Sequence, residues 1–177
     1  MKLVVDSGST KTDWGFFNTA YDLRSVKTQG INPCHQSVEA ISTIIKSELL
    51  PNTSGIDLNT VNEVYYYGAG CATESICVQM AGILKEFFPN AVIAVDSDML
   101  GAARALCGRS EGVACVLGTG SNSCIYNGKE IVDQVPSLGY ILGDEGSSAA
   151  IGRRLIGDCL KRQLPEAVCN EFMERYQ

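Results

Sequence analysis

Several glycine-containing segments of the sequence carry hydroxyl, ammonium or carboxylate side chains that could do chemistry together. The first is residues 6–12, DSGSTKT. Glycine lets a backbone come close to a bulky anion, and successive N–H groups in such a turn can hold phosphate oxygens. Lys11 would add positive charge, and Asp6 offers a carboxylate that could hold Mg²⁺ directly or through water. An ordinary Gly/Ser hairpin is the alternative interpretation.

A second segment of the same build is residues 118–122, GTGSN, which also lies between two strand-like runs. Two such turns could hold a polyphosphate from two sides. Neither segment is a P-loop or a GxGxxG fingerprint, because both of those motifs need a helix directly after the glycines.

Acidic and amide side chains follow other strand-like runs. Asp96 and Asp98 come after the apolar run 91–95, at the strand end that faces the ligand crevice in α/β sheets; Asp98 could instead be only a helix N-cap. Asp144 precedes a helix, where the macrodipole alone would favour it. Asn32 could bind a ligand or only make an Asx-turn.

The elements that must position these residues are predicted from periodicity and from turn residues. The order is βββαβαβα, which indicates a mixed α/β sheet. The fully apolar run 91–95 predicts a strand covered on both faces. The strands are predicted over 2–6, 13–18, 24–28, 61–67 and 91–95, and the helices over 36–50, 73–88 and 98–107.

The strand meander then restarts, which makes an internal duplication of topology a candidate. Strands are predicted over 112–117, 121–126 and 130–132, with a hairpin turn at Asn127-Gly128, and helices over 147–162 and 165–177. We therefore predict two domains, 1–110 and 111–177. The second has no further strand–helix units and is expected to be the beginning of a truncated domain.

Composition limits the partners. The chain has 177 residues and a net charge of −6, which argues against nucleic acid and anionic membrane surfaces. We expect a cytoplasmic protein, because the sequence shows neither a membrane-spanning run nor a signal-peptide pattern. The eight cysteines form no CxxC pair, and they are predicted to be small buried hydrophobes rather than disulfides or metal ligands.

Six motifs occur in order: DSGSTKTDW, GIN, YYYGAG, VDSD, VLGTGSN and LGDEGS. Together they resemble the sugar kinase/Hsp70/actin ATPase superfamily. More narrowly, they are similar to the N-acetylglucosamine-kinase-like branch of the BadF/BadG/BcrA/BcrD ATPase family. The resemblance implies an α/β fold of ribonuclease H-like (actin-like ATPase) type. A first domain with a mixed five-stranded sheet is followed by the start of a second one, with ATP in the cleft between the two.

The resemblance also implies roles for single residues. Asp98 matches the catalytic base, and Asp6 the position that holds Mg²⁺ through water. The positions implied to bind ATP are Asp6, Gly8, Ser9, Thr10, Lys11, Thr12, Gly118, Thr119, Gly120 and Ser121. The positions implied to contact the sugar are Asn32, Thr119, Gly120, Asn122, Gly139 and Asp144. Leu138 stands where the family's GGWG segment has tryptophan, which bears on sugar choice.

The implied function is ATP-dependent phosphoryl transfer to a hydroxyl of N-acetylglucosamine or a related hexose, in carbohydrate metabolism. One alternative is an ATPase that energises a partner protein, of the dehydratase-activator type. Another is a non-catalytic sugar-binding relative. The expected partner is a small-molecule sugar, with no nucleic acid and no membrane, and a homodimer stays open.

Overall fold

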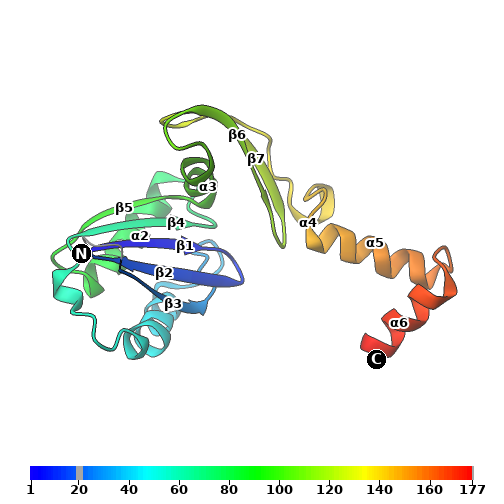
Figure 1. Cartoon of the computed structure of the whole chain (residues 1–177), viewed down its shortest axis with the longest axis horizontal. Helices are drawn as coiled ribbons and strands as arrows, with labels where there is room; N and C mark the ends of the chain where they lie inside the picture. The colour runs from blue at the N-terminus through cyan, green and yellow to red at the C-terminus, as the bar shows by residue number, and fades with distance from the viewer. Residues whose placement is uncertain (19–21, 177) are drawn as a thin grey trace. The chain divides into compact units, whose positions relative to one another are not determined.

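The computed structural model describes residues 1–18 and 22–176. The chain divides into two compact units, Met1–Gly108 and Arg109–Gln177. The first contains a mixed five-stranded sheet in the order β3-β2-β1-β4-β5 (Figure 1). The sheet contains β1 (Lys2–Ser7), β2 (Lys11–Phe17), β3 (Leu23–Gln29), β4 (Glu63–Gly68) and β5 (Val92–Ser97).

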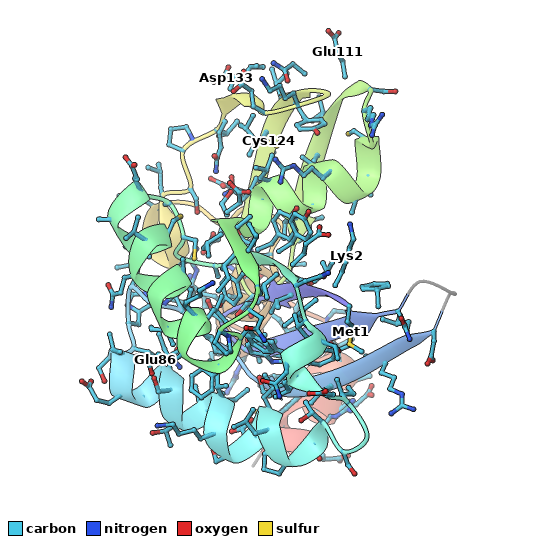
Figure 2. All side chains as sticks on the ribbon, turned by 90° about the vertical axis from the view of Figure 1, so that its left-hand side faces the viewer. Met1, Lys2, Glu86, Glu111, Cys124 and Asp133 are labelled. Atoms are coloured by element: carbon cyan, nitrogen blue, oxygen red, sulfur yellow. The ribbon has the colours of Figure 1, made fainter. Side chains whose placement is uncertain are left out.

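This sheet confirms the fold class that the sequence predicted. β1, β2 and β3 form an antiparallel meander, while β4 and β5 run parallel to β1. At the amino end of the sheet the ammonium of Met1 donates to the carbonyl of Thr60 (2.8 Å), and Lys2 pairs with Glu63 at 3.0 Å; Met1 and Lys2 are labelled in Figure 2.

Helical segments follow the strands: α1 (Val38–Ile44), the π-helical η1 (Ile45–Leu49), the 3₁₀ turns η2 (Leu50–Asn52) and η3 (Leu58–Thr60), α2 (Glu74–Phe87) and α3 (Asp98–Cys107). The prediction of one regular helix over 36–50 was wrong. Ser37 caps α1 by accepting from Ala40 N, so the helix starts at residue 38. After Ile44 the chain widens into a π-helical turn, and the 3₁₀ turn η2, which contains Pro51, follows it.

The core of the first unit lies on one face of the sheet. Leu3 and Val5 of β1, Trp14 of β2 and Tyr66 of β4 are all fully buried there. They form one hydrophobic cluster with the apolar side chains of α1, η1 and α2, including Ile41, Leu49 and Leu84. The opposite face of the sheet is contacted by α3. A Cβ at Gly101 of α3 would lie 2.7 Å from the Tyr67 ring, so this glycine permits close packing.

The prediction that the strand at 91–95 is covered on both faces was wrong. β5 is the edge strand of the sheet, and two of its alternate side chains, Val92 (75% exposed) and Ala94, face solvent. The other face of this strand is covered by α2 only in part, with Ile93 and Val95 half-buried. An apolar run is therefore compatible with an edge strand here.

The second unit repeats the strand meander, as predicted, which supports the start of a second ribonuclease H-like domain. Its antiparallel sheet has the order β6-β7-β8, followed by three helices. The short helix α4 was not predicted. The elements are β6 (Glu111–Leu117), β7 (Ser121–Asn127), β8 (Ile131–Gln134), α4 (Gly139–Leu142), α5 (Ser148–Leu160) and α6 (Glu166–Tyr176). The helix predicted over 165–177 is described up to residue 176.

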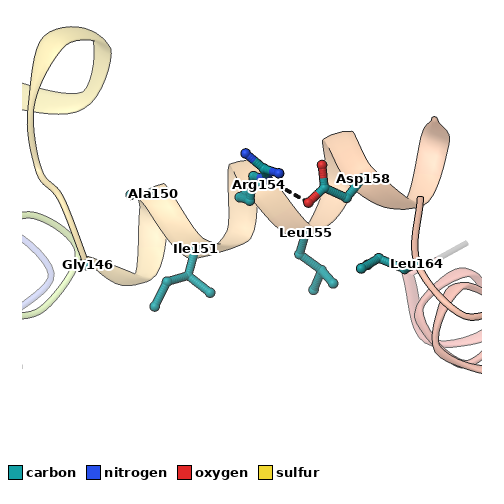
Figure 3. A pocket seen from close by; sticks show the side chains of 7 residues that line it. All are labelled: Gly146, Ala150, Ile151, Arg154, Leu155, Asp158 and Leu164. Carbon is teal, nitrogen blue, oxygen red and sulfur yellow. Dashed lines mark hydrogen bonds and ion pairs between the residues drawn. The ribbon is translucent and has the colours of Figure 1, made fainter. Parts of the chain in front are cut away.

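Much apolar surface of the second unit is exposed. Among the described residues, five exposed large hydrophobic side chains lie in the first unit and fifteen in the second. Ile151 and Leu155 project from the same side of α5 over an open hollow of about 410 Å³ (Figure 3). A three-stranded sheet with three helices buries less of its apolar surface than the larger first unit does.

The cysteine prediction held only in part. Cys71, Cys124 and Cys159 are buried, but Cys34 and Cys115 are exposed, and all eight thiols are free. Cys115 lies on the outward face of β6, next to the inward-facing and fully buried Ala114. The period of two in a strand turns neighbouring small residues to opposite faces.

Candidate functional site

The carboxyl ends of the three parallel strands meet in one register. Ser7 of β1 lies opposite Gly68 of β4, and Gly68 lies opposite Ser97 of β5. The next residue of each strand therefore leaves the sheet at the same edge. The N–H of Ala69 donates to the carbonyl of Ser7 (2.7 Å), which ties two of these exits together. The residues that follow β1, β4 and β5 are thus neighbours, although they are distant in sequence.

The first glycine turn is a tight hairpin between β1 and β2. The N–H of Gly8 donates to the carbonyl of Lys11 at 2.9 Å. The segment after β3 packs on this turn, since the N–H of Gly30 donates to the carbonyl of Thr10 (3.0 Å). A Cβ at Gly30 would overlap the backbone of Ser9. Glycine at position 30 is therefore required by the fold itself.

At two glycines of the predicted phosphate turns, packing within the fold does not require glycine. A Cβ at Gly8 would meet its nearest neighbour, the carbonyl oxygen of Lys11, at 3.5 Å, which is ordinary contact. A Cβ at Gly118 would have nothing within 4 Å. Neither residue has a left-handed φ angle. The fold would accept alanine at both positions, so packing among the described residues does not require glycine there.

The charged side chains of the first turn are partly engaged. Lys11 Nζ lies 2.9 Å from Asp13 Oδ2, and this hydrogen bond raises the pKa of Lys11. The expected contact between Lys11 and a phosphate would thus compete with Asp13. Asp6 is exposed and lies opposite Asp13 in the register, so it shares a face of the sheet with that residue.

Asn32 reaches the same edge of the sheet. Its Oδ1 accepts from the N–H of Cys34 (3.0 Å), so the Asx-turn interpretation holds. Its Nδ2 donates to Ser9 Oγ at 3.3 Å, so the same carboxamide also contacts the first turn. Gly70, with φ of 82°, packs directly on Asn32 Oδ1, and a Cβ there would overlap that atom. Asn32 thus lies between the turn after β1 and the turn after β4.

Asp98 is the first residue of α3 and is not its N-cap. That role belongs to Ser97, whose Oγ accepts from the N–H of Leu100 (3.3 Å), so the interpretation of Asp98 as a cap was wrong. Asp98 Oδ1 accepts from Met99 N at 2.9 Å. Burial raises the pKa of Asp98, and the negative charge of Asp6 raises it further. A carboxylate with a raised pKa is a stronger proton acceptor.

Asp96 has a different environment. Its Oδ2 pairs with Arg104 Nη1 at 3.3 Å, and the same nitrogen donates to the hydroxyl of Tyr67 (3.0 Å). The guanidinium therefore balances the charge of Asp96. Of the two neighbouring carboxylates, Asp98 is better suited to accept a proton.

In the second unit the predicted turn is held against the start of α5. The N–H of Gly118 donates to the carbonyl of Gly120 (2.9 Å), and both the N–H and the Oγ of Ser148 donate to the carbonyl of Gly118 (2.9 and 2.8 Å). Asp144 Oδ1 accepts from the N–H of Ser121 at 3.1 Å. This N–H, predicted to face a phosphate, is thus engaged by Asp144.

Two further predicted residues of this unit are Asn122 and Gly139. Asn122 follows Ser121 in β7, and its Oδ1 accepts from the N–H of Ser123 (2.8 Å). Gly139 begins α4 with a φ angle of 71°. The structure thus brings the predicted residues into two groups. One group, with Ser9, Asn32 and Asp98, lies at the shared strand edge of the first unit. The other lies around the turn after β6.

Tyr66 was missed by the sequence analysis. It is fully buried, and its ring covers Gly68, where a Cβ would overlap it. Among the described residues its hydroxyl is the one buried side-chain oxygen or nitrogen that makes no hydrogen bond. Burial raises the pKa of this phenol. The only sequence signal was the run of three tyrosines in a predicted strand. Neighbouring strand residues face opposite sides of the sheet, so this run indicates an inward-facing tyrosine but not that its hydroxyl lacks a hydrogen bond.

The chain is similar to solved structures over most of its length. One is a Porphyromonas gingivalis protein provisionally named N-acetylglucosamine kinase, with 49% identity, a TM-score of 0.93, and 99% of this chain and 62% of that chain covered. A similarly named protein from Chromobacterium violaceum has 17% identity and a TM-score of 0.64, covering 90% and 56%. MreB 5 of Spiroplasma citri, bound to AMPPNP, has 12% identity and a TM-score of 0.55, covering 78% and 53%.

The fold of the chain is that of the actin-like ATPases. The chain resembles a protein provisionally named N-acetylglucosamine kinase, as its motifs predicted. The chain spans less than two thirds of the length of each of these three relatives. No family model and no curated protein matches it.

The described residues contain neither a membrane-spanning helix nor a cluster of metal-ligating side chains. Within residues 1–18 and 22–176, no helix is long and apolar enough to cross a membrane. In the same part of the chain, no three His, Cys, Asp or Glu side chains converge as a metal site would require.

We predict that Tyr66→Phe leaves the free energy of unfolding unchanged or raises it by up to about 1 kcal/mol, because the buried hydroxyl has no partner to lose. Tyr67→Phe is the matched control. It removes the acceptor of Arg104 and should lower stability by about 0.5–1.5 kcal/mol. Urea unfolding measures both. A clear loss of stability in Tyr66→Phe would mean that the hydroxyl is hydrogen-bonded.

We also predict that Asp6→Asn lowers the pKa of Asp98, because it removes a like charge that favours the protonated carboxyl. The fraction of ionised Asp98 at a given acidic pH should therefore rise. Carbon-detected NMR titration of the Asp98 carboxyl, without metal, measures the shift. Asp13→Asn, one step along the same row of the sheet, should leave the titration close to that of the unchanged protein. If the pKa of Asp98 did not move in Asp6→Asn, the charge of Asp6 would not be a cause of its raised value.

Proposed function

We propose that the full-length protein is an ATP-dependent kinase that phosphorylates a hydroxyl of N-acetylglucosamine or a related hexose. The observation that carries the proposal is the position of Asp98. A half-buried carboxylate with a raised pKa stands at the strand edge shared with the first turn and Asn32. The 49% identity to a protein provisionally named N-acetylglucosamine kinase supports the same activity.

Each of the two turns, taken by itself, has residues that could contact a nucleotide phosphate. Packing within the fold does not require glycine at position 8 or 118, and Ser9 and Thr10 are exposed beside Gly8. Bound ATP would supply the phosphoryl group, and Mg²⁺ would offset its charge. Asp6 would hold the Mg²⁺, through water, from the end of β1. In the second turn Asp144 orients the backbone by accepting from Ser121.

Asp98 would accept the proton of the attacking sugar hydroxyl, and its raised pKa favours that transfer. Asn32 would orient the sugar, since its carboxamide is already directed by Cys34 and Ser9. Phosphoryl transfer depends on such positioning more than on covalent help from the protein. We propose in addition that the sugar contacts Asn122, Gly139 and Asp144.

The domain assignment is also a proposal. Residues 1–110 would form the domain that carries the first turn and Asp98, and residues 111–177 the beginning of a second ribonuclease H-like domain. The second unit exposes many apolar side chains. These side chains support the proposal that another part of the protein or a partner covers this unit. A cytoplasmic location stays a prediction.

We predict that Asp98→Asn lowers kcat by about 10²–10⁴-fold, the usual contribution of a general base. Asp96→Asn is the matched control, because it removes a carboxylate two residues away that Arg104 already neutralises. It should keep most of the activity. The assay follows ADP release by the full-length protein across a panel of amino sugars and hexoses. Turnover that does not depend on any sugar would contradict the kinase, and sugar binding without turnover would favour a non-catalytic relative.

We further predict that Gly8→Ala weakens ATP binding at least tenfold while it changes the free energy of unfolding by less than about 1 kcal/mol, since the fold has room for the methyl group. Gly30→Ala is the contrasting variant. Its methyl would overlap the backbone of Ser9 and should cost about 1–3 kcal/mol of stability. Calorimetric titration with an ATP analogue and urea unfolding separate the two effects. Unchanged nucleotide affinity in Gly8→Ala would argue against phosphate binding at this turn.

A further inference from the structure

One side chain, that of Gln36, holds the backbone of residues 30–32 through hydrogen bonds. Gln36 Oε1 accepts from the N–H of Asn32 at 2.8 Å, and its Nε2 donates to the carbonyl of Gly30 at 3.1 Å. The N–H of Gln36 also donates to the carbonyl of Asn32 (3.1 Å). The carboxamide thus bridges the backbone on both sides of Ile31.

These contacts fix the orientation of the carboxamide. A flipped amide would place its NH₂ against the N–H of Asn32 and its oxygen against the carbonyl of Gly30, so both hydrogen bonds would be lost. Gln36 is half-buried, which limits competition from water. The side chain therefore sets one conformation of residues 30–32.

The middle of the segment has a separate anchor. Ile31 is fully buried, and its carbonyl accepts from the buried Ser7 Oγ at 3.0 Å. Removal of the Gln36 side chain would leave this anchor in place. The fold should survive, while the N–H of Asn32 and the carbonyl of Gly30 would lose the partner that orients them.

We propose that Gln36 is a positioning residue for the sugar: it acts through Asn32 and touches no reacting atom. This inference rests on the proposed function, in which the Asn32 carboxamide orients the sugar. That carboxamide also contacts Ser9 in the first turn, so a shift of a few tenths of an ångström in the Asn32 backbone would misalign it. The sugar contact should be more sensitive to this shift than the nucleotide contact, because the turn at residues 8–10 has its own backbone hydrogen bonds.

The experiment compares Gln36→Ala and Gln36→Glu with Gln29→Ala in the full-length protein. Gln29 is a matched control, because its backbone N–H and its Nε2 donate to the two carboxylate oxygens of Glu48, both at 2.8 Å, and its side chain does not contact Asn32. Gln36→Ala should raise KM for the sugar by about 3–10-fold, the worth of a lost hydrogen bond, with KM for ATP changed less than about twofold. Gln36→Glu keeps the acceptor for Asn32 N but sets a carboxylate oxygen against the carbonyl of Gly30, so it should also raise KM for the sugar.

Amide hydrogen exchange supplies a readout that does not depend on activity. The N–H of Asn32 should exchange faster in Gln36→Ala than in Gln29→Ala, while the amides of β1 and β2 keep their protection. Unchanged exchange at Asn32, equal rises in KM for sugar and ATP, or the same effect in Gln29→Ala would each overturn the proposal. An unmodified full-length protein with no sugar-dependent turnover and no sugar binding would instead overturn the proposed function.

Discussion

The candidate site depends on the register of three parallel strands. Ser7, Gly68 and Ser97 lie in one row, so the first turn, the turn that packs on Asn32 and the start of α3 leave the sheet side by side. A slip of β5 by one residue would exchange the faces of its side chains and move Asp98 away from this edge. The hydrophobic core keeps the register, because the same strands place Val5 and Tyr66 inward on the face that α2 covers.

Five of the glycines divide into two groups once the neighbours of each are known. Gly30, Gly68 and Gly70 stand where a methyl group would overlap Ser9, Tyr66 or Asn32, so the fold alone accounts for them. Gly8 and Gly118 have room for a methyl group and ordinary φ angles, so packing within the fold does not account for glycine there. Both groups look alike in the sequence, since each adjoins a strand.

Periodicity predicted the strands to within two residues and the meander that repeats in the second unit, because alternating burial leaves a direct mark on the sequence. It missed the π-helical turn after Ile44, which keeps the helical pattern of apolar residues and differs only in backbone hydrogen bonds. It overestimated the burial of β5, because an apolar run does not show whether a strand lies at an edge. The motifs pointed to Asn32 and Asp98, whereas Gln36 and Tyr66 carry no motif and gain meaning only from their neighbours in space.

Aspartate at position 144 meets two separate structural requirements, one of the backbone conformation and one of hydrogen bonding. Its φ angle is 60°, a conformation that asparagine, aspartate and glycine tolerate best, and its carboxylate also supports the turn after β6 through Ser121. The backbone conformation and the turn would both favour aspartate at this position even without any sugar. A relative that had lost its ligand could therefore retain this aspartate for reasons of folding alone.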